Sequence, residues 1–191
     1  WEYICTYVDD LIYAGHNARL FFDNILQSKH GFKLKGVGEP RYHLGGDFRR
    51  MMEPEHMLTW GSKTYVKRMM ENYEQMFGEP VSNRKTYAPL SPNDHPELDE
   101  TDFCTEIQKK HFWSMIGELQ WVVALGRFDV HCAVQTMSRF RPQPRIGHLD
   151  RLRRIYRYLK TYPETSIKFN VEEPDYSNYT VLKDAKWGHV Y

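Results

Sequence analysis

The sequence predicts an α+β fold, and three observations support this. Residues 3–14 are rich in Tyr, Ile, Val and Thr, which is typical of strands. Later segments place apolar residues at helical spacing, namely 62–77, 103–126 and 147–161. Short runs that alternate or are broken by glycine are typical of strands joined by turns, namely 32–51, 57–60, 166–170 and 179–185.

Size and composition indicate an ordinary globular protein of one to two domains. The chain has 191 residues, a net charge of +1, 41% hydrophobic and 27% charged residues. Its apolar runs fall short of the roughly 20 residues that span a bilayer, so no membrane association is expected. No signal peptide is visible, and Cys5, Cys104 and Cys132 form no CxxC pair. These features predict an intracellular protein, cytoplasmic or nuclear rather than secreted, with reduced thiols. A chain that opens on Trp1 is expected to be a fragment of something longer.

Residues 1–77 are predicted to hold two strands, a helix, several short strands and a second helix. The strands of 3–14 meet at Asp9 and Asp10. An amphipathic helix is expected at 17–30, with Asn17 as its cap and Gly31 as its stop. A second helix is expected at 62–77 with Ser62 as its cap, and its Met and aromatic stripe is most simply core.

The central segment 78–102 is predicted to be an acidic, proline-rich linker, and its charge run is most simply a solvated face. Helices are then expected at 103–126, 129–140 and 147–161, the last with its arginines outward. From 139 to 168 the chain carries nine basic and two acidic residues, so this region would attract a polyanion.

The paired aspartates, Asp9 and Asp10, interrupt an otherwise apolar, strand-like stretch. A polar hairpin turn is the simpler explanation, because Asp is common in turns. Against it, the stretch offers no Gly or Asn for the positive φ of a tight hairpin, and no nearby base offsets the two carboxylates. A divalent cation would resolve the repulsion, since Mg²⁺ prefers hard oxygen ligands and serves two-metal phosphoryl transfer.

Tyr7-Val8-Asp9-Asp10, followed by Leu-Ile-Tyr-Ala-Gly, resembles the YxDD box of copia-type LTR retrotransposon reverse transcriptases. Further motifs of that family follow in the same order along nearly the whole chain. They are Gly38-Glu39-Pro40 with Leu44-Gly45, Ala88-Pro89-Leu90, Arg127-Phe128-Asp129, Ser138-Arg139-Phe140, Pro144, His148 and Tyr158-Leu159-Lys160. YVDD alone is a moderate signal, whereas the ordered series is a strong one.

The resemblance implies a role for each matching residue. Asp9 and Asp10 would be catalytic metal-binding carboxylates of the polymerase palm, with Asp10 the less critical. Tyr7 and Val8 would lie near the primer end, and a loose match makes the hairpin 42–47 a candidate primer grip. The helices of 103–162 would form thumb and connection elements. Four arginines of the last helix could contact the nucleic-acid backbone or simply form a solvated face, namely Arg151, Arg153, Arg154 and Arg157.

Near the C-terminus, Asp184 matches the first catalytic carboxylate of the family's RNase H domain. Lys186 stands where the family usually has a second acid, which weakens the match. A lone Asp near a strand end is otherwise most simply structural.

The resemblance divides the chain into four parts: the end of a palm at 1–77, the linker at 78–102, helical thumb and connection at 103–162, and the start of an RNase H-like domain at 163–191. It implies an RNA-directed DNA polymerase that adds deoxynucleotides to a primer 3′ end with two Mg²⁺ ions. Its partners would be a primer–template, dNTPs and the rest of a polyprotein, including the fingers and a further Asp-bearing palm strand. Without that strand the isolated chain is expected to be inactive. A non-catalytic nucleic-acid-binding remnant of a retroelement is the alternative, and a plain structural domain with an acidic turn fits the motif series less well.

Overall fold

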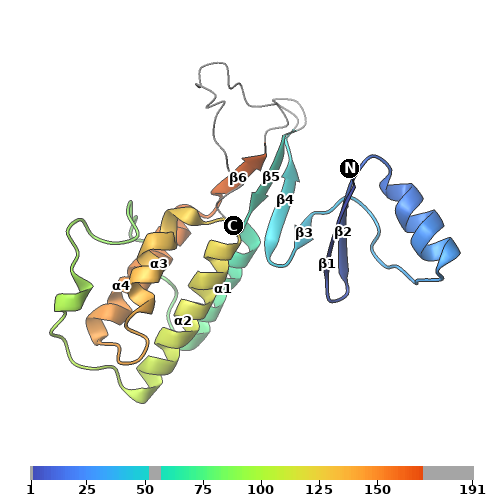
Figure 1. The fold of residues 1–191 in the computed structure, drawn as a ribbon. Helices are drawn as coiled ribbons and strands as arrows, with labels where there is room; N and C mark the ends of the chain where they lie inside the picture. Colours follow the sequence, from blue (N-terminus) through green and yellow to red (C-terminus); the bar gives the residue numbers. More distant parts are fainter. Residues whose placement is uncertain (1, 52–56, 170–191) are drawn as a thin grey trace, which may run out of the picture.

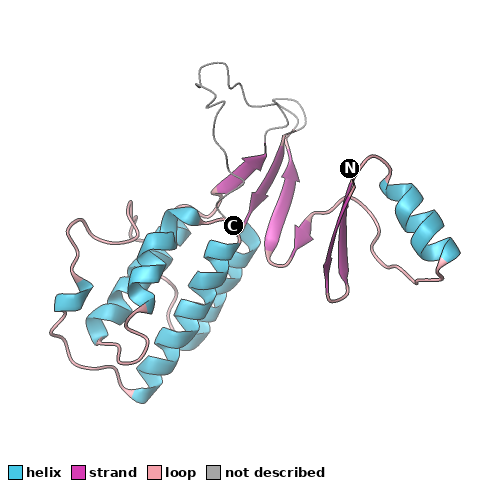
Figure 2. Ribbon diagram, viewed as in Figure 1, coloured by secondary structure: helices cyan, strands magenta, loops and turns pink. Residues whose placement is uncertain are grey.

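The computed structural model describes residues 2–51 and 57–169, and this part of the chain is α+β, as predicted (Figures 1 and 2). Its elements, in chain order, are β1 (Tyr3–Tyr7), β2 (Asp10–Ala14), η1 (Leu20–Lys29), β3 (Tyr42–His43), β4 (Gly46–Arg50), β5 (Leu58–Gly61), α1 (Lys63–Phe77), η2 (Pro96–Leu98), α2 (Glu106–Ala124), η3 (Phe128–Val130), α3 (His131–Ser138), α4 (Ile146–Thr161) and β6 (Ser166–Phe169). The strand predicted at 179–185 lies outside the described residues. No helix within the described ranges is both long and apolar enough to cross a membrane.

The N-terminal unit is an antiparallel hairpin, β1–β2, with η1 packed beside it (Figure 1). The Tyr13 ring of β2 stacks on Phe21 of η1 at a centroid distance of 5.1 Å. The predicted cap is confirmed, because Asn17 Oδ1 accepts a hydrogen bond from the Leu20 amide at 3.1 Å. The helix is of π type rather than the expected α type; its last turn includes a bond from the His30 amide to the Ile25 carbonyl.

A second, four-stranded antiparallel sheet has the order β3-β4-β5-β6. The close approach of β4 to β5 needs glycine at position 46, because a Cβ there would lie 2.0 Å from the Trp60 ring. Strand β6 pairs with β5 along Leu58 to Gly61. The sheet therefore combines residues from both sides of the predicted boundary at 162.

The main core lies among α1, α2, α3 and α4, and the helical predictions for these segments are confirmed. Fully buried side chains include Phe112, Ile116, Leu119, Val134, Leu152 and Ile155. A capping box begins α2, in which Thr105 Oγ1 accepts from the Gln108 amide and the Gln108 side chain accepts from the Thr105 amide. This reciprocal cap fixes the first residue of the most apolar helix.

Helix α1 begins after Ser62, as predicted, but the Ser62 side chain does not cap it. Asp47 of β4 does so instead: its Oδ2 accepts from the Thr64 amide at 2.8 Å and its Oδ1 from the Thr64 hydroxyl at 2.6 Å. The Ser62 hydroxyl is fully buried and makes no hydrogen bond with the described residues. A carboxylate brought from the sheet is the better acceptor at the positive end of the helix.

The segment 78–102 has little regular structure and lies along α4. The Thr86 amide donates to Thr161 Oγ1 at 3.2 Å, and the Arg154 Nε donates to the Ala88 carbonyl at 3.2 Å. Farther along, His148 Nε2 lies 2.9 Å from the Pro96 carbonyl oxygen. These contacts make the segment part of the helical unit, where the sequence had predicted a linker.

Candidate active site

The turn between β1 and β2 consists of Val8 and Asp9, because Tyr7 pairs directly with Asp10. Val8 has φ +49°, in the left-handed region that a β-branched residue rarely adopts. The absence of Gly or Asn had counted against a tight turn, yet the structure forms one and places the strain on Val8. Strained backbone of this kind is concentrated at functional sites.

The two aspartates at this turn are exposed to solvent. The nearest charged partner of Asp10 is His43 of β3, with 3.9 Å between Oδ2 and Nδ1, and the Asp10 side chain remains 66% exposed. Within the described residues neither aspartate forms an ion pair with Lys or Arg. The turn therefore presents carboxylate oxygens that no Lys or Arg of the described ranges neutralises.

These carboxylates have the donor chemistry that Mg²⁺ prefers. They supply only part of a site, because no group of three His, Cys, Asp or Glu side chains in the described ranges could hold a metal ion. A metal bound here would need further oxygen ligands, from water, a phosphate or a carboxylate outside the described part of the chain.

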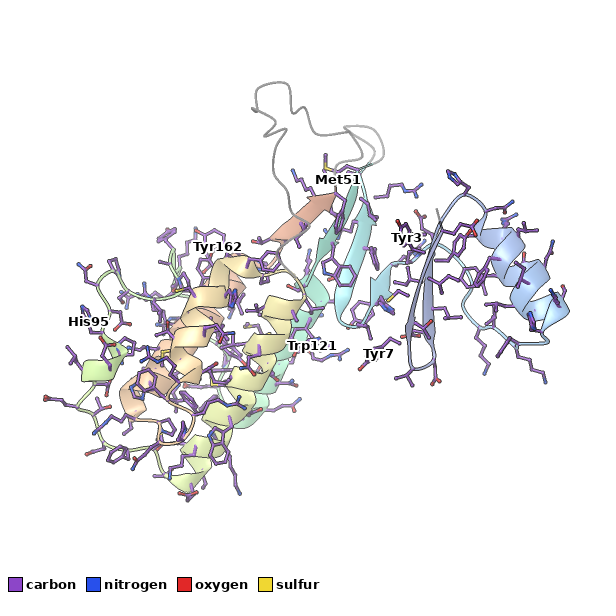
Figure 3. All side chains as sticks on the ribbon, viewed as in Figure 1. Tyr3, Tyr7, Met51, His95, Trp121 and Tyr162 are labelled. Carbon is purple, nitrogen blue, oxygen red and sulfur yellow. The ribbon has the colours of Figure 1, made fainter. Side chains whose placement is uncertain are left out.

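Apolar side chains are exposed along β1 and in the turn that follows it. Tyr7 is 50% and Val8 81% exposed, and Tyr7 lies toward the turn end of the hairpin in Figure 3. Tyr3 and Ile4 of the same strand are also exposed. In the described structure β1 and β2 pair only with each other, so both outer edges have backbone groups free to pair with another strand.

The hairpin β3–β4, the candidate primer grip, lies between the β1–β2 hairpin and the helices (Figure 1). Its two-residue turn has positive φ at Leu44 and Gly45, and Trp121 Nε1 of α2 donates to the Leu44 carbonyl at 3.2 Å. Its His43, nearly buried, faces Asp10. His43 could not be predicted as a neighbour of the aspartates, since the contact joins positions far apart in the chain.

The four arginines of α4 are not equivalent. Arg151 is held by the acidic segment: its Nη2 lies 2.8 Å from Asp94 Oδ1 and its Nη1 2.5 Å from Asp99 Oδ2. The three side chains are only 20%, 13% and 6% exposed. Asp94 and Asp99 are thus not part of a solvated face, and Arg151 is already occupied by intramolecular partners.

This ion pair is expected to make stability depend on pH. Burial favours the neutral form of Asp99, but hydrogen bonds from Thr101 and Arg151 outweigh it and lower the pKa of Asp99. A lowered folded pKa contributes stability above the unfolded value of about 3.9, and this stability is lost as pH falls through the folded pKa. Arg151→Gln should lower the free energy of unfolding by about 1–3 kcal/mol at pH 7.

Urea unfolding of the wild type and of Arg151→Gln from pH 7 to pH 2 measures this loss of stability. The difference in free energy of unfolding between the two proteins should shrink at the acidic end. Arg141→Gln, a change at an exposed arginine, is the matched control and should stay near wild type at every pH. A deficit for Arg151→Gln that is as large at pH 2 as at pH 7 would contradict the electrostatic explanation.

The other three arginines leave more of their hydrogen-bonding capacity unused. Arg154 donates from Nε to Ala88, and Arg153 donates from Nη1 to Asp150 Oδ1 at 2.8 Å. The Arg157 guanidinium makes no hydrogen bond or ion pair with the described residues. Four arginines of α4 were predicted to contact the nucleic-acid backbone. Of these, Arg153, Arg154 and Arg157 are therefore better placed to bind a phosphate than Arg151.

Asp184 and Lys186 lie outside the described residues, so the assignment of Asp184 stays a prediction. Asp9 and Asp10 share one turn, whereas the arginines lie on α4 among the helices; the described structure does not gather them in one cluster (Figure 1).

The motif Arg127-Phe128-Asp129 has a structural explanation. Arg127 is 1% exposed and donates from Nε and Nη2 to the two carboxylate oxygens of Asp129 at 2.9 and 2.8 Å. Burial would raise the pKa of Asp129, but the bonds and charge of Arg127 outweigh it and the pKa is lowered. This ion pair, with its guanidinium buried, lies in the connection between α2 and α3.

Comparison with known proteins gives matches at low identity over most of the chain. It is 26% identical over 165 residues to the Retrovirus-related Pol polyprotein from transposon RE1 of Arabidopsis thaliana, covering 86% of this chain and 10% of that protein. The chain is a relative of retrotransposon Pol polyproteins.

Shorter relatives also match. A putative transposon Ty5-1 protein of Saccharomyces cerevisiae is 26% identical over 194 residues, covering 99% of this chain and 58% of that protein. An uncharacterized mitochondrial protein of Arabidopsis thaliana is 26% identical over 198 residues, covering 97% of this chain and 76% of that protein. No protein-family model and no solved structure matches the chain.

Proposed function

We propose that this retroelement-derived chain is the metal-binding end of a reverse transcriptase palm together with its thumb and connection region. The observation that carries the proposal is the Asp9–Asp10 pair, exposed where a strained two-residue turn enters β2, with no Lys or Arg partner among the described residues. Relatedness to Pol polyproteins supports it independently. The reaction is the templated addition of deoxynucleotides to a primer 3′ end, with release of pyrophosphate.

Asp9 and Asp10 would hold Mg²⁺, which supplies Lewis-acid activation and charge stabilisation for phosphoryl transfer. The tight turn places the two aspartates next to each other at one end of a short hairpin, where both would be available to the same metal site. His43 limits the freedom of Asp10 from one side. Exposed Tyr7 and Val8 are free to contact the primer end.

Nucleic acid would lie against a basic surface, which we define as Arg84, Lys85, Arg153, Arg154, Arg157 and Lys160. Arg84 and Lys85 are exposed on the segment that lies along α4. Lysine and arginine side chains contact phosphates without regard to base sequence, as a polymerase requires. The RNase H role of Asp184 is proposed on the resemblance alone.

Primer extension tests this function. We expect the 191-residue chain alone to show no Mg²⁺-dependent extension of an RNA-templated primer, because two carboxylates do not complete a two-metal site. A protein that joins the chain to the sequence encoded upstream of Trp1 should be active. Extension by the isolated chain, or none by the longer protein when it is folded and binds primer–template, would contradict the proposal.

The second candidate is a non-catalytic nucleic-acid-binding remnant. It is favoured by one observation: the same segment makes up 58% and 76% of two short relatives, rather than a tenth of a polyprotein. A stop codon or frameshift immediately upstream of Trp1 would support the remnant, and an open frame with a further Asp-bearing strand would support the polymerase.

A further inference from the structure

A small cavity lies between α4 and the chain that follows α1. Its volume is about 170 Å³. Arg153 and Arg157 line one side, residues 79–82 line the other, and Tyr73 of α1 contributes apolar surface. The lining is predominantly polar, and two guanidinium groups are its main charged feature.

Both arginines have unused donors at this place. Arg153 Nε and Arg157 Nε are buried and make no hydrogen bond within the described structure. An arginine Nε–H is a strong donor, and a buried donor without an acceptor costs about 1–3 kcal/mol. Because the two residues are four apart on one helix, their side chains are neighbours and can donate to a single ligand.

Other arginines of the same helix show that these free donors are specific to the cavity. Arg151 Nε donates to Asp94 at 3.0 Å, and Arg154 Nε donates to the Ala88 carbonyl at 3.2 Å. Arg153 is partly engaged, through Asp150 and through its position 4.8 Å over the Phe77 ring, but its Nε is not. Of the two arginines that line the cavity, Arg157 has no partner among the described residues, and its guanidinium is the one left for an external acceptor.

The lining favours a tetrahedral oxyanion. The Ser82 hydroxyl accepts from the Arg84 amide at 3.3 Å, which leaves its O–H free to donate. Guanidinium groups match the geometry of phosphate oxygens, and Arg84 and Lys85 follow directly in the chain. Glu79 is the acidic side chain at the rim, and it would weaken such binding.

We propose that this cavity is a phosphate seat, in which the guanidinium groups of Arg153 and Arg157 and the Ser82 hydroxyl hold one backbone phosphate of a bound nucleic acid. The nucleic-acid source of the phosphate rests on the proposed function, whereas the anion site rests on the cavity alone. The seat would fix the position of the strand against α4, and the rest of the basic surface would add attraction without fixed geometry.

Titration of the 191-residue chain with inorganic phosphate, followed by NMR of the arginine Nε–H resonances, tests the seat. We expect saturable shifts of Arg153 and Arg157 but not of Arg151. Arg157→Gln and Arg157→Lys should both weaken phosphate binding about tenfold. The lysine variant keeps the positive charge but loses the planar guanidinium group, whose several N–H donors match phosphate oxygens. Glu79→Gln should tighten it.

Arg141→Gln is the matched control. Position 141 is exposed and precedes α4, and Arg157 lies eleven positions after Ile146, which places it about 16 Å along the helix from its start. Arg141→Gln removes the same charge as Arg157→Gln and should leave phosphate affinity unchanged. Equal losses for Arg157→Gln and Arg141→Gln, or no Nε–H shift in a folded wild-type chain, would overturn the seat.

A second readout separates the seat from the proposed function. In duplex primer–template binding, Arg157→Gln should reduce the slope of log affinity against log salt by about 0.9. Phosphate binding without any primer–template binding would support the anion site and overturn its nucleic-acid ligand. Primer–template binding with an unchanged slope for Arg157→Gln would overturn the seat and leave the proposed function standing.

Discussion

Arg127→Ala is expected to lower the free energy of unfolding by about 2–5 kcal/mol, because it leaves a cavity where a fully buried side chain stood and removes the charged partner of Asp129. Arg127 is 1% and Asp129 26% exposed, and two hydrogen bonds join them. The substitution also removes a large side chain from the junction of α2 and α3. Gly126 beside it has φ +98°, and a Cβ there would lie 2.6 Å from Ile167, so this junction packs closely on β6.

Urea unfolding at pH 7 measures the loss, and a double variant identifies its cause. Replacing both residues, as in Arg127→Met with Asp129→Leu, fills much of the space of the Arg127 side chain and removes both charges together, so it should recover much of the stability lost in Arg127→Ala. Arg141→Gln serves as the exposed control. A loss below about 1 kcal/mol for Arg127→Ala would show that the pair is an ordinary surface ion pair.

Asp9→Asn is expected to reduce primer extension by at least about a thousandfold in a protein that contains the upstream sequence. Asparagine keeps the shape of the side chain and suits a turn equally well, so the hairpin should persist. What it removes is the negative charge that would hold Mg²⁺. Asp10→Asn should cost less, because the resemblance makes Asp10 the less critical carboxylate.

Single-turnover kinetics at saturating primer–template separates chemistry from binding. Asp23→Asn, at an exposed aspartate of η1, is the control for loss of one negative charge in this part of the chain. It should extend primers at the wild-type rate. Equal rates for Asp9→Asn and wild type would remove the metal-binding role of the turn.

Local sequence patterns predicted most of the elements, although residues 32–41 of the predicted strand region form no strand. Apolar residues at helical spacing predicted α1, α2 and α4, and the β-rich run predicted two strands that meet at the aspartates. Asn17 was predicted correctly as a cap because its partner lies three residues away. The relation to retrotransposon Pol polyproteins also followed from ordered motifs in the sequence alone.

Contacts between distant segments were not predictable in the same way. Asp47 rather than Ser62 caps α1, and the choice depends on how β4 lies beside the helix. Asp94 and Asp99 have no basic neighbour in sequence, yet Arg151 reaches both from α4. The positive φ of Val8 was likewise not predictable, because the residue preferences of tight turns argued against a two-residue turn there.

The most direct test of the central claim is to locate the metal. With Fe²⁺ in place of Mg²⁺ and a reductant with peroxide, hydroxyl radicals cut the backbone next to a bound ion. In the upstream-extended protein with primer–template, cleavage should map to the turn at Val8–Asp9, be suppressed by excess Mg²⁺ and disappear in Asp9→Asn. Cleavage elsewhere in the folded complex, with none at this turn, would contradict the assignment of Asp9 and Asp10 as metal ligands.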